Sequence, residues 1–192
     1  MSLYELGISN GDISLAALLR GEPGEAINPG LELDDLAEAI CRGGWPAFRN
    51  QLRRAAKRHF VDPSLAVAAL QAAPSGLVRD LSFMGLLFES MVIRDLKIYA
   101  QAIDGEVEHY QDSSQLEVDA IVRTADSWGA FEVKLGGSKR VEEGAAALAR
   151  FKARIDTTKS GDPAALAVIA GVGYGYVRKD GIQVIPIGCL GP

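Results

Sequence analysis

The stretch AFEVKL at residues 130–135, together with LEVDAIV at residues 116–122, decides the fold and the site that this sequence predicts. Side chains alternate between the two faces of a β-strand, so Glu132 and Lys134 share one face and the apolar residues between them share the other. If the two stretches pair as neighbouring strands, Asp119 of the first can face Glu132 of the second. The sequence therefore predicts two carboxylates and one amine at a single place on a sheet.

The same alternation assigns the other residues of the 116–122 stretch to faces. Leu116, Val118 and Ala120 are expected on one side, and Glu117, Asp119 and Ile121 on the other. Two carboxylates placed side by side repel each other, so they need a cation, a shared proton or a lysine to neutralise them. A divalent metal is one such solution, and Lys134 is another.

The regular elements around these stretches are expected in the order α-β-β-β-α-β. They are a helix at 77–101, strands at 105–110, 116–123 and 129–135, a helix at 139–156 and a strand at 165–171. A hairpin follows, with Tyr174–Arg178 and Ile182–Pro186 on either side of an Asp-Gly turn. A three-stranded meander followed by a helix and a further strand predicts a mixed α/β fold, with helices packed on a mixed sheet.

The first 60 residues differ from the rest of the chain. Short helices are expected at 12–20 and 33–41, separated by glycine and proline, and a short helix from Pro63 to Leu70 then opens the main domain. We therefore expect a small helical appendage at 1–60 and one larger domain at 61–192.

The composition excludes several classes of protein. Hydrophobic residues make up 48% of the chain and charged residues 23%, which is ordinary for a globular domain. The apolar stretches are too short to cross a bilayer, and the N-terminus lacks the features of a secretory signal, so we expect a cytoplasmic protein. The net charge of −5 argues against nucleic-acid binding through a field of the whole molecule. Any such contact must be local.

A third acidic residue is predicted to join the pair from the helix at 77–101. At 100° per residue, Glu89 lies on the apolar stripe with Leu86 and Val92, whereas Ser90 and Arg94 mark the polar face. A carboxylate in apolar surroundings is unfavourable unless it is paired or binds a metal. Glu89 therefore needs a partner across the fold, and a structural ion pair is the plainer alternative to a metal.

The remaining patterns are weaker. One local cluster of basic residues could follow a phosphate backbone or form a solvated helix face; it consists of Arg49, Arg53, Arg54, Lys57, Arg58 and His59. The GGSK stretch that ends at Lys139 follows a strand and opens a helix, so its backbone amides could hold an anion. The G-x-x-x-x-G-K-[ST] spacing of a phosphate loop does not occur in the chain, which excludes nucleotide hydrolysis of that type.

Three stretches carry a resemblance to known proteins. They are GLLFES at 85–90, LEVDAI at 116–121 and FEVKLG at 131–136, and together they resemble the PD-(D/E)XK nuclease superfamily. Residues 59–192 resemble the C-terminal domain of unknown function, DUF4143, of prokaryotic AAA+-type ATPases. Residues 1–5 and 41–46 are similar to segments that follow the nucleotide-binding core in those ATPases, and we expect that core to be absent here.

The resemblance implies a restriction-endonuclease-like fold and a set of roles. Asp119 and Glu132 would hold Mg²⁺, with the Val133 carbonyl as a further ligand and Glu89 completing the site. Lys134 would orient the attacking water and stabilise the charge that develops on the phosphate. The reaction would be hydrolysis of a phosphodiester bond in DNA.

Two functions therefore stay open at this point. The first is a Mg²⁺-dependent nuclease-like domain that acts on DNA. The second is a regulatory or protein-interaction module in which the same carboxylates serve only as structural ion pairs, and the acidic net charge favours it. The candidate partners are DNA, an ATPase or another protein, and a second copy of the chain, without a membrane. ATP hydrolysis by this chain alone is not expected.

Overall fold

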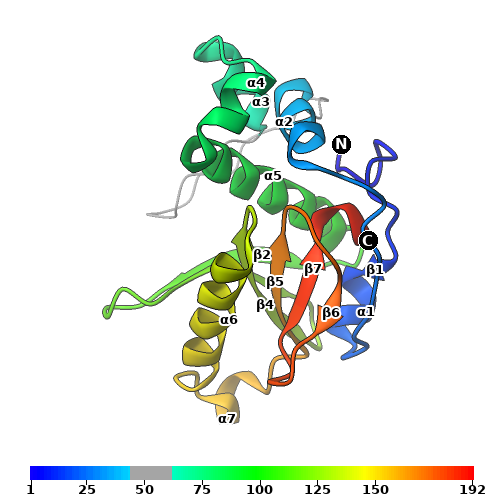
Figure 1. The fold of residues 1–192 in the computed structure, drawn as a ribbon. Coiled ribbons are helices and arrows are strands. Elements are labelled where there is room, and N and C mark those ends of the chain that lie inside the picture. The colour runs from blue at the N-terminus through cyan, green and yellow to red at the C-terminus, as the bar shows by residue number, and fades with distance from the viewer. Residues whose placement is uncertain (44–61) are drawn as a thin grey trace.

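The computed structural model describes residues 1–43 and 62–192 and shows a mixed α/β fold (Figure 1). The helices are α1 (Leu15–Leu19), α2 (Leu33–Arg42), α3 (Pro63–Ala69), α4 (Pro74–Arg79), α5 (Leu81–Gln101), α6 (Ser138–Lys152), α7 (Thr157–Ser160) and the 3₁₀ turn η1 (Ile187–Cys189). The strands are β1 (Ile13–Ser14), β2 (Glu106–Gln111), β3 (Glu117–Arg123), β4 (Trp128–Lys134), β5 (Ala165–Ala170), β6 (Tyr176–Val177), β7 (Gln183–Pro186) and β8 (Leu190–Gly191). The predicted mixed α/β class is confirmed.

One mixed sheet of six strands, in the order β2-β3-β4-β5-β7-β6, organises the molecule. The meander β2-β3-β4 is antiparallel, β4, β5 and β7 run parallel, and β6 pairs antiparallel with β7 as the predicted hairpin. Because parallel neighbours need a crossover, the chain passes through α6 between β4 and β5. The predicted pairing of the 116–122 and 130–135 stretches is confirmed, and Ala120 lies opposite Phe131.

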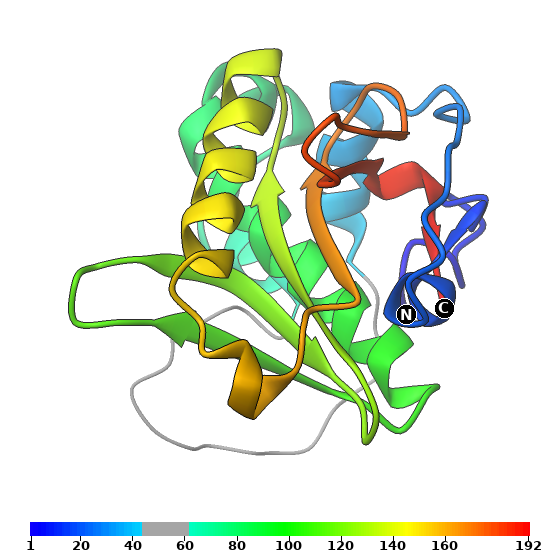
Figure 2. The same cartoon turned by 90° about the horizontal axis from the view of Figure 1, so that it is seen from below.

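Helices cover both faces of this sheet (Figures 1 and 2). On one face α5 packs against β3, β4, β5 and β7 through a cluster that includes Phe88, Leu96, Phe131 and Ile169. On the other face α6 packs through a second apolar cluster that includes Leu148. The strands therefore carry apolar residues on both sides, which matches the near-continuous apolar runs expected of strands that are covered on both faces.

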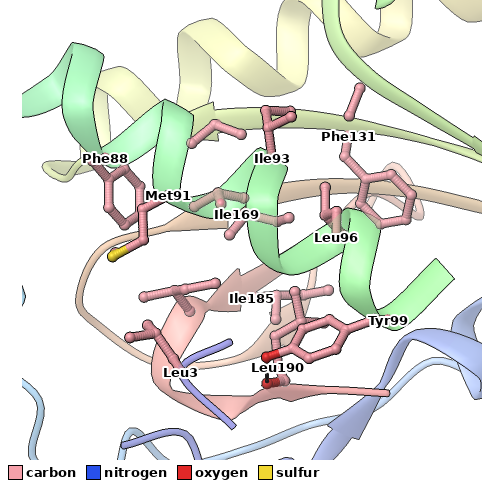
Figure 3. Packing of buried hydrophobic residues seen from close by; sticks show 14 of the residues in the cluster. Leu3, Phe88, Met91, Ile93, Leu96, Tyr99, Phe131, Ile169, Ile185 and Leu190 are labelled. Carbon is pink, nitrogen blue, oxygen red and sulfur yellow. Dashed lines mark hydrogen bonds between the residues drawn. The ribbon is translucent and has the colours of Figure 1, made fainter. Parts of the chain in front are cut away.

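The N-terminal segment packs into the same core as the sheet. β1 pairs in parallel with β8, so the two ends of the chain lie side by side (Figure 2). Leu3 is fully buried in the α5 cluster, and the Tyr99 hydroxyl donates to the Leu190 carbonyl at 3.3 Å (Figure 3). Side chains of residues 1–43 thus contribute to the main core, and the predicted domain boundary at residues 60 and 61 falls outside the described residues.

Two helices start at different residues from those predicted. The predicted helix at 77–101 is two helices, because the Asp80 side chain accepts from the Phe83 amide and caps α5, while Pro74 opens α4. The predicted helix at 12–20 is β1 followed by α1, which Ser14 caps. Within the described ranges, no helix is long and apolar enough to cross a membrane.

A β-bulge on β3 changes which side chains share a face. Glu108 pairs with Ile121, but Tyr110 pairs with Val118, so β3 has one residue more than β2 over this interval. The predicted grouping of Val118 with Ala120 is therefore wrong. Val118 packs with Ile121 under α6, whereas Ala120 packs under α5. The extra residue lies in β3 immediately beside Asp119.

Candidate functional site

All four predicted site residues, Glu89, Asp119, Glu132 and Lys134, line one cavity of about 310 Å³. Side chains from α5, from the turn between β2 and β3, from β3, β4 and α6 form its walls. Among the described residues, the lining consists of Glu89, Gln115, Leu116, Glu117, Asp119, Glu132, Lys134, Ala147 and Arg150. The structure thus brings the predicted residues to one place, while their chemical roles stay predictions.

Asp119 and Glu132 form the buried centre of the cavity. The β3–β4 register that sets Ala120 opposite Phe131 brings Asp119 beside Glu132, and the two side chains are only 7% and 5% exposed. The backbone amide of Val133 donates to Asp119 Oδ2 at 2.9 Å, which fixes that carboxylate against β4. Val133 thus contributes its backbone amide to the site. That the Val133 carbonyl binds a metal stays a prediction.

Lys134 joins this acid pair from the same strand as Glu132. Its Nζ lies 2.6 Å from Glu132 Oε2 and 3.5 Å from Asp119 Oδ2, so one ammonium contacts both carboxylates. Burial lowers the pKa of Lys134, but the attraction of Asp119 and Glu132 and the hydrogen bonds to them raise it, and the net shift is upward. The amine is therefore protonated at neutral pH, so it stabilises negative charge and does not accept a proton.

Glu89 reaches the cavity from α5, and Val92 is buried as the predicted stripe requires, but the prediction is wrong at Leu86 and Ser90. Leu86 is 63% exposed, whereas Ser90 is buried at 4%. The Ser90 hydroxyl donates to the Leu86 carbonyl at 3.2 Å, so the serine satisfies its own polar group and can face the core. Glu89 is partly buried at the edge of this face.

Asp119 and Glu132, without a third carboxylate, are the candidate protein ligands for a small divalent cation. No group of three or more His, Cys, Asp or Glu side chains within residues 1–43 and 62–192 is arranged to hold a metal ion, so Glu89 as a direct ligand is unsupported and stays a prediction. Mg²⁺ keeps several waters and needs only one or two carboxylates together with substrate oxygens. Asp119 and Glu132 meet that smaller requirement.

Of the five predicted nucleic-acid residues, the structure describes one, Lys139. Arg53, Arg54, Lys57 and Arg58 lie outside the described residues. Lys139 is exposed in the first turn of α6 and is not among the residues that line the cavity.

Three polar lining residues were not predicted from the sequence: Gln115, Glu117 and Arg150. Glu117 could have been chosen, because strand alternation already put it on the side of Asp119. It contacts His109 Nε2 at 3.0 Å. Arg150 could not have been chosen from the sequence, because only the packing of α6 on β4 brings it to the site.

A second buried charged cluster lies away from the cavity. Arg94 contacts Asp95 at 2.8 Å and Asp62 at 3.5 Å, and the amide of Leu3 donates to Asp95 at 2.8 Å. Burial raises the pKa of Asp95 to about 6, although Arg94 and the Leu3 amide favour its charged form. These contacts tie α5 to the N-terminal segment and to the start of α3.

The fold and the cavity define a mixed α/β domain with a buried acid–lysine centre. The family model described as "Domain of unknown function (DUF4143)" matches residues 84–190, more than half of the chain, and the protein belongs to this family. The match spans the cavity-lining residues from Glu89 to Arg150 that the structure describes. No curated protein and no solved structure has a significant match to the chain.

Proposed function

We propose that this protein is a Mg²⁺-dependent nuclease-like domain of the PD-(D/E)XK type that hydrolyses phosphodiester bonds in DNA. The observation that carries the proposal is the meeting of Asp119, Glu132 and Lys134 in one cavity. The element order α5-β2-β3-β4-α6-β5 supports it, because it is the α-β-β-β-α-β order expected of a restriction-endonuclease-like core.

The charge of the cavity supports a need for a divalent cation. Its described lining contains four carboxylates against one lysine and one arginine. An acidic cavity repels a phosphate group, so a phosphodiester can approach the acid pair only with a cation between them.

Each residue then has a role that follows from its position. Asp119 and Glu132 would hold Mg²⁺, which when bound polarises a phosphoryl oxygen and lowers the pKa of a bound water. The Val133 amide keeps Asp119 oriented. The ammonium of Lys134 orients the attacking water and stabilises the negative charge that develops on the phosphate. Glu89 lines the same cavity and would complete the metal site.

We further propose that the domain derives from the C-terminal part of AAA+-type ATPases. The support is the similarity of residues 1–5 and 41–46 to segments of those proteins. Residues 1–192 contain no phosphate loop, so we do not propose ATP hydrolysis by these residues alone.

One observation favours a second candidate, a catalytically inactive interaction module. Lys134 Nζ at 2.6 Å from Glu132 already compensates part of the charge of the acid pair without a metal. In that case the cavity is a structural ion-pair network that maintains the fold.

Cleavage of supercoiled plasmid and of a labelled single-stranded oligonucleotide, each in Mg²⁺ and in Mn²⁺, distinguishes the two candidates. We expect cleavage by the wild type and a loss of about a hundredfold or more in Asp119→Asn and Glu132→Gln. Glu143→Gln, an exposed carboxylate on α6 that does not line the cavity, is the matched control. Intact DNA with the wild type in both metals would support the interaction module.

A further inference from the structure

Arg150 differs from the other cations around the cavity. Lys134 contacts Glu132 and Asp119, and Arg154, one helical turn beyond Arg150, binds Asp112 at 3.0 Å. Arg150 itself lines the cavity, yet within residues 1–43 and 62–192 it forms no ion pair and no side-chain hydrogen bond. An exposed guanidinium at the wall of an acidic cavity therefore keeps its donors available for a ligand.

The packing of α6 explains why Arg150 reaches this position. Gly144 packs tightly, since a Cβ there would lie 3.3 Å from Lys134 Cγ and 3.4 Å from Glu132 Cβ, so the helix approaches β4 closely. Ala147, one turn later, lines the cavity with a small side chain and leaves room above the acid pair. Arg150 follows on the next turn and lies on the α6 wall of the cavity.

The turn between β2 and β3 forms another part of the cavity wall. It projects beyond the rest of the sheet (Figure 2). Arg154 joins this turn to the end of α6 through Asp112 and Ser114. The neighbouring Gln115 lines the cavity. Arg150 therefore lines the cavity four residues before this link.

We propose that Arg150 binds a phosphate group of a polynucleotide on the α6 side of the cavity, next to the group that is hydrolysed. The guanidinium offers paired donors that match two phosphate oxygens, which a lysine cannot reproduce. A polynucleotide carries a neighbouring phosphate and a mononucleotide does not, so the substrate class is an oligonucleotide or longer. This inference rests on the proposed function for its ligand, but it concerns binding and not hydrolysis.

Fluorescence anisotropy of a labelled single-stranded oligonucleotide in Ca²⁺ tests the inference, with Arg150→Ala and Arg150→Lys compared with the wild type. We expect a rise in Kd of about tenfold or more for Arg150→Ala and a smaller one for Arg150→Lys. The slope of log Kd against log salt should also fall by about 0.7, the loss of one contact to single-stranded DNA. Lys152→Ala is the matched control, an exposed cation on α6 that does not line the cavity.

The possible outcomes test the Arg150 inference separately from the proposed hydrolysis of DNA. Binding that depends on Arg150, without any cleavage in Mg²⁺ or Mn²⁺, supports the inference and contradicts the proposed hydrolysis. Equal binding by the wild type and Arg150→Ala overturns the inference, whether or not the wild type cleaves DNA. An absence of binding by the wild type also overturns it. An equal loss of affinity in Lys152→Ala would show a non-specific charge effect and overturn it as well.

Discussion

Replacing Lys134 by Met removes the ammonium from the buried acid pair while it retains most of the side chain's volume. The apolar part of the side chain stays, so the change in stability comes from the loss of the charge and not from an unfilled volume. The variant leaves Asp119 and Glu132, which are 7% and 5% exposed, beside each other without the lysine that contacts both. The free energy of unfolding should fall because like charges then face each other in a buried position.

The magnitude follows from the burial of the three groups. Breaking a buried ion pair by removing one partner destabilises a protein by about 3–5 kcal/mol. Because the Lys134 side chain is 25% exposed, solvent screens part of its interaction, and we expect a loss of about 3 kcal/mol at pH 8. At a pH low enough to protonate both carboxylates the repulsion disappears, so the loss should shrink there.

Urea unfolding followed by circular dichroism at both pH values measures this change. Lys139→Met, an exposed lysine on α6 that does not line the cavity, is the control and should differ from the wild type by less than about 0.5 kcal/mol. Mg²⁺ should restore part of the stability of Lys134→Met, because a cation again neutralises the pair. A loss below about 1 kcal/mol, or an equal loss at both pH values, would refute the reasoning.

Two further predictions concern the fold. The pKa of Asp95 is raised from 3.8 to about 6, so folding favours its protonated form and stability falls as the pH rises between these values. In urea unfolding across this range, the wild type should lose about 3 kcal/mol relative to Asp95→Asn, and parallel pH profiles would contradict this. In Gly171→Ala the new Cβ would lie 2.2 Å from the Leu135 carbonyl oxygen, so thermal unfolding should show a loss of about 2 kcal/mol or more. Gly85→Ala, with nothing within 4 Å, should instead stabilise α5 by up to about 1 kcal/mol, and a comparable loss in both variants would count against the packing argument.

The sequence predicted the central sheet well because its strands carry strong local patterns. The alternation around Glu132 and Lys134 identified β4, and the short connection between the two stretches favoured their antiparallel pairing. The order of elements from α5 to β5 followed from hydrophobic periodicity alone. These features depend on residues close together in the chain.

The errors come from features that local patterns do not encode. The bulge on β3 depends on the register with β2, so it reversed the face expected for Val118 relative to Ala120. The pairing of β1 with β8 joins segments from the two ends of the chain. The start of α5 at its N-cap Asp80 was also missed, because the apolar pattern continues on either side of it.

The site was predicted where strand geometry fixes it and missed where tertiary packing does. Asp119, Glu132 and Lys134 lie on two adjacent strands, so their meeting follows from one register. Arg150 reaches the cavity only through the close packing of α6 at Gly144. No periodicity in the sequence distinguishes Arg150 from the neighbouring exposed cations of that helix.

Calorimetric titration of Mn²⁺ into the wild type and into Asp119→Asn tests most directly whether the acid pair binds a divalent cation. The wild type should give a saturable heat with about one ion per chain, and Asp119→Asn, which keeps the shape of the side chain but not its charge, should give none. If the wild type shows no binding heat at millimolar Mn²⁺, or if both proteins bind alike, the acid pair is not a metal site.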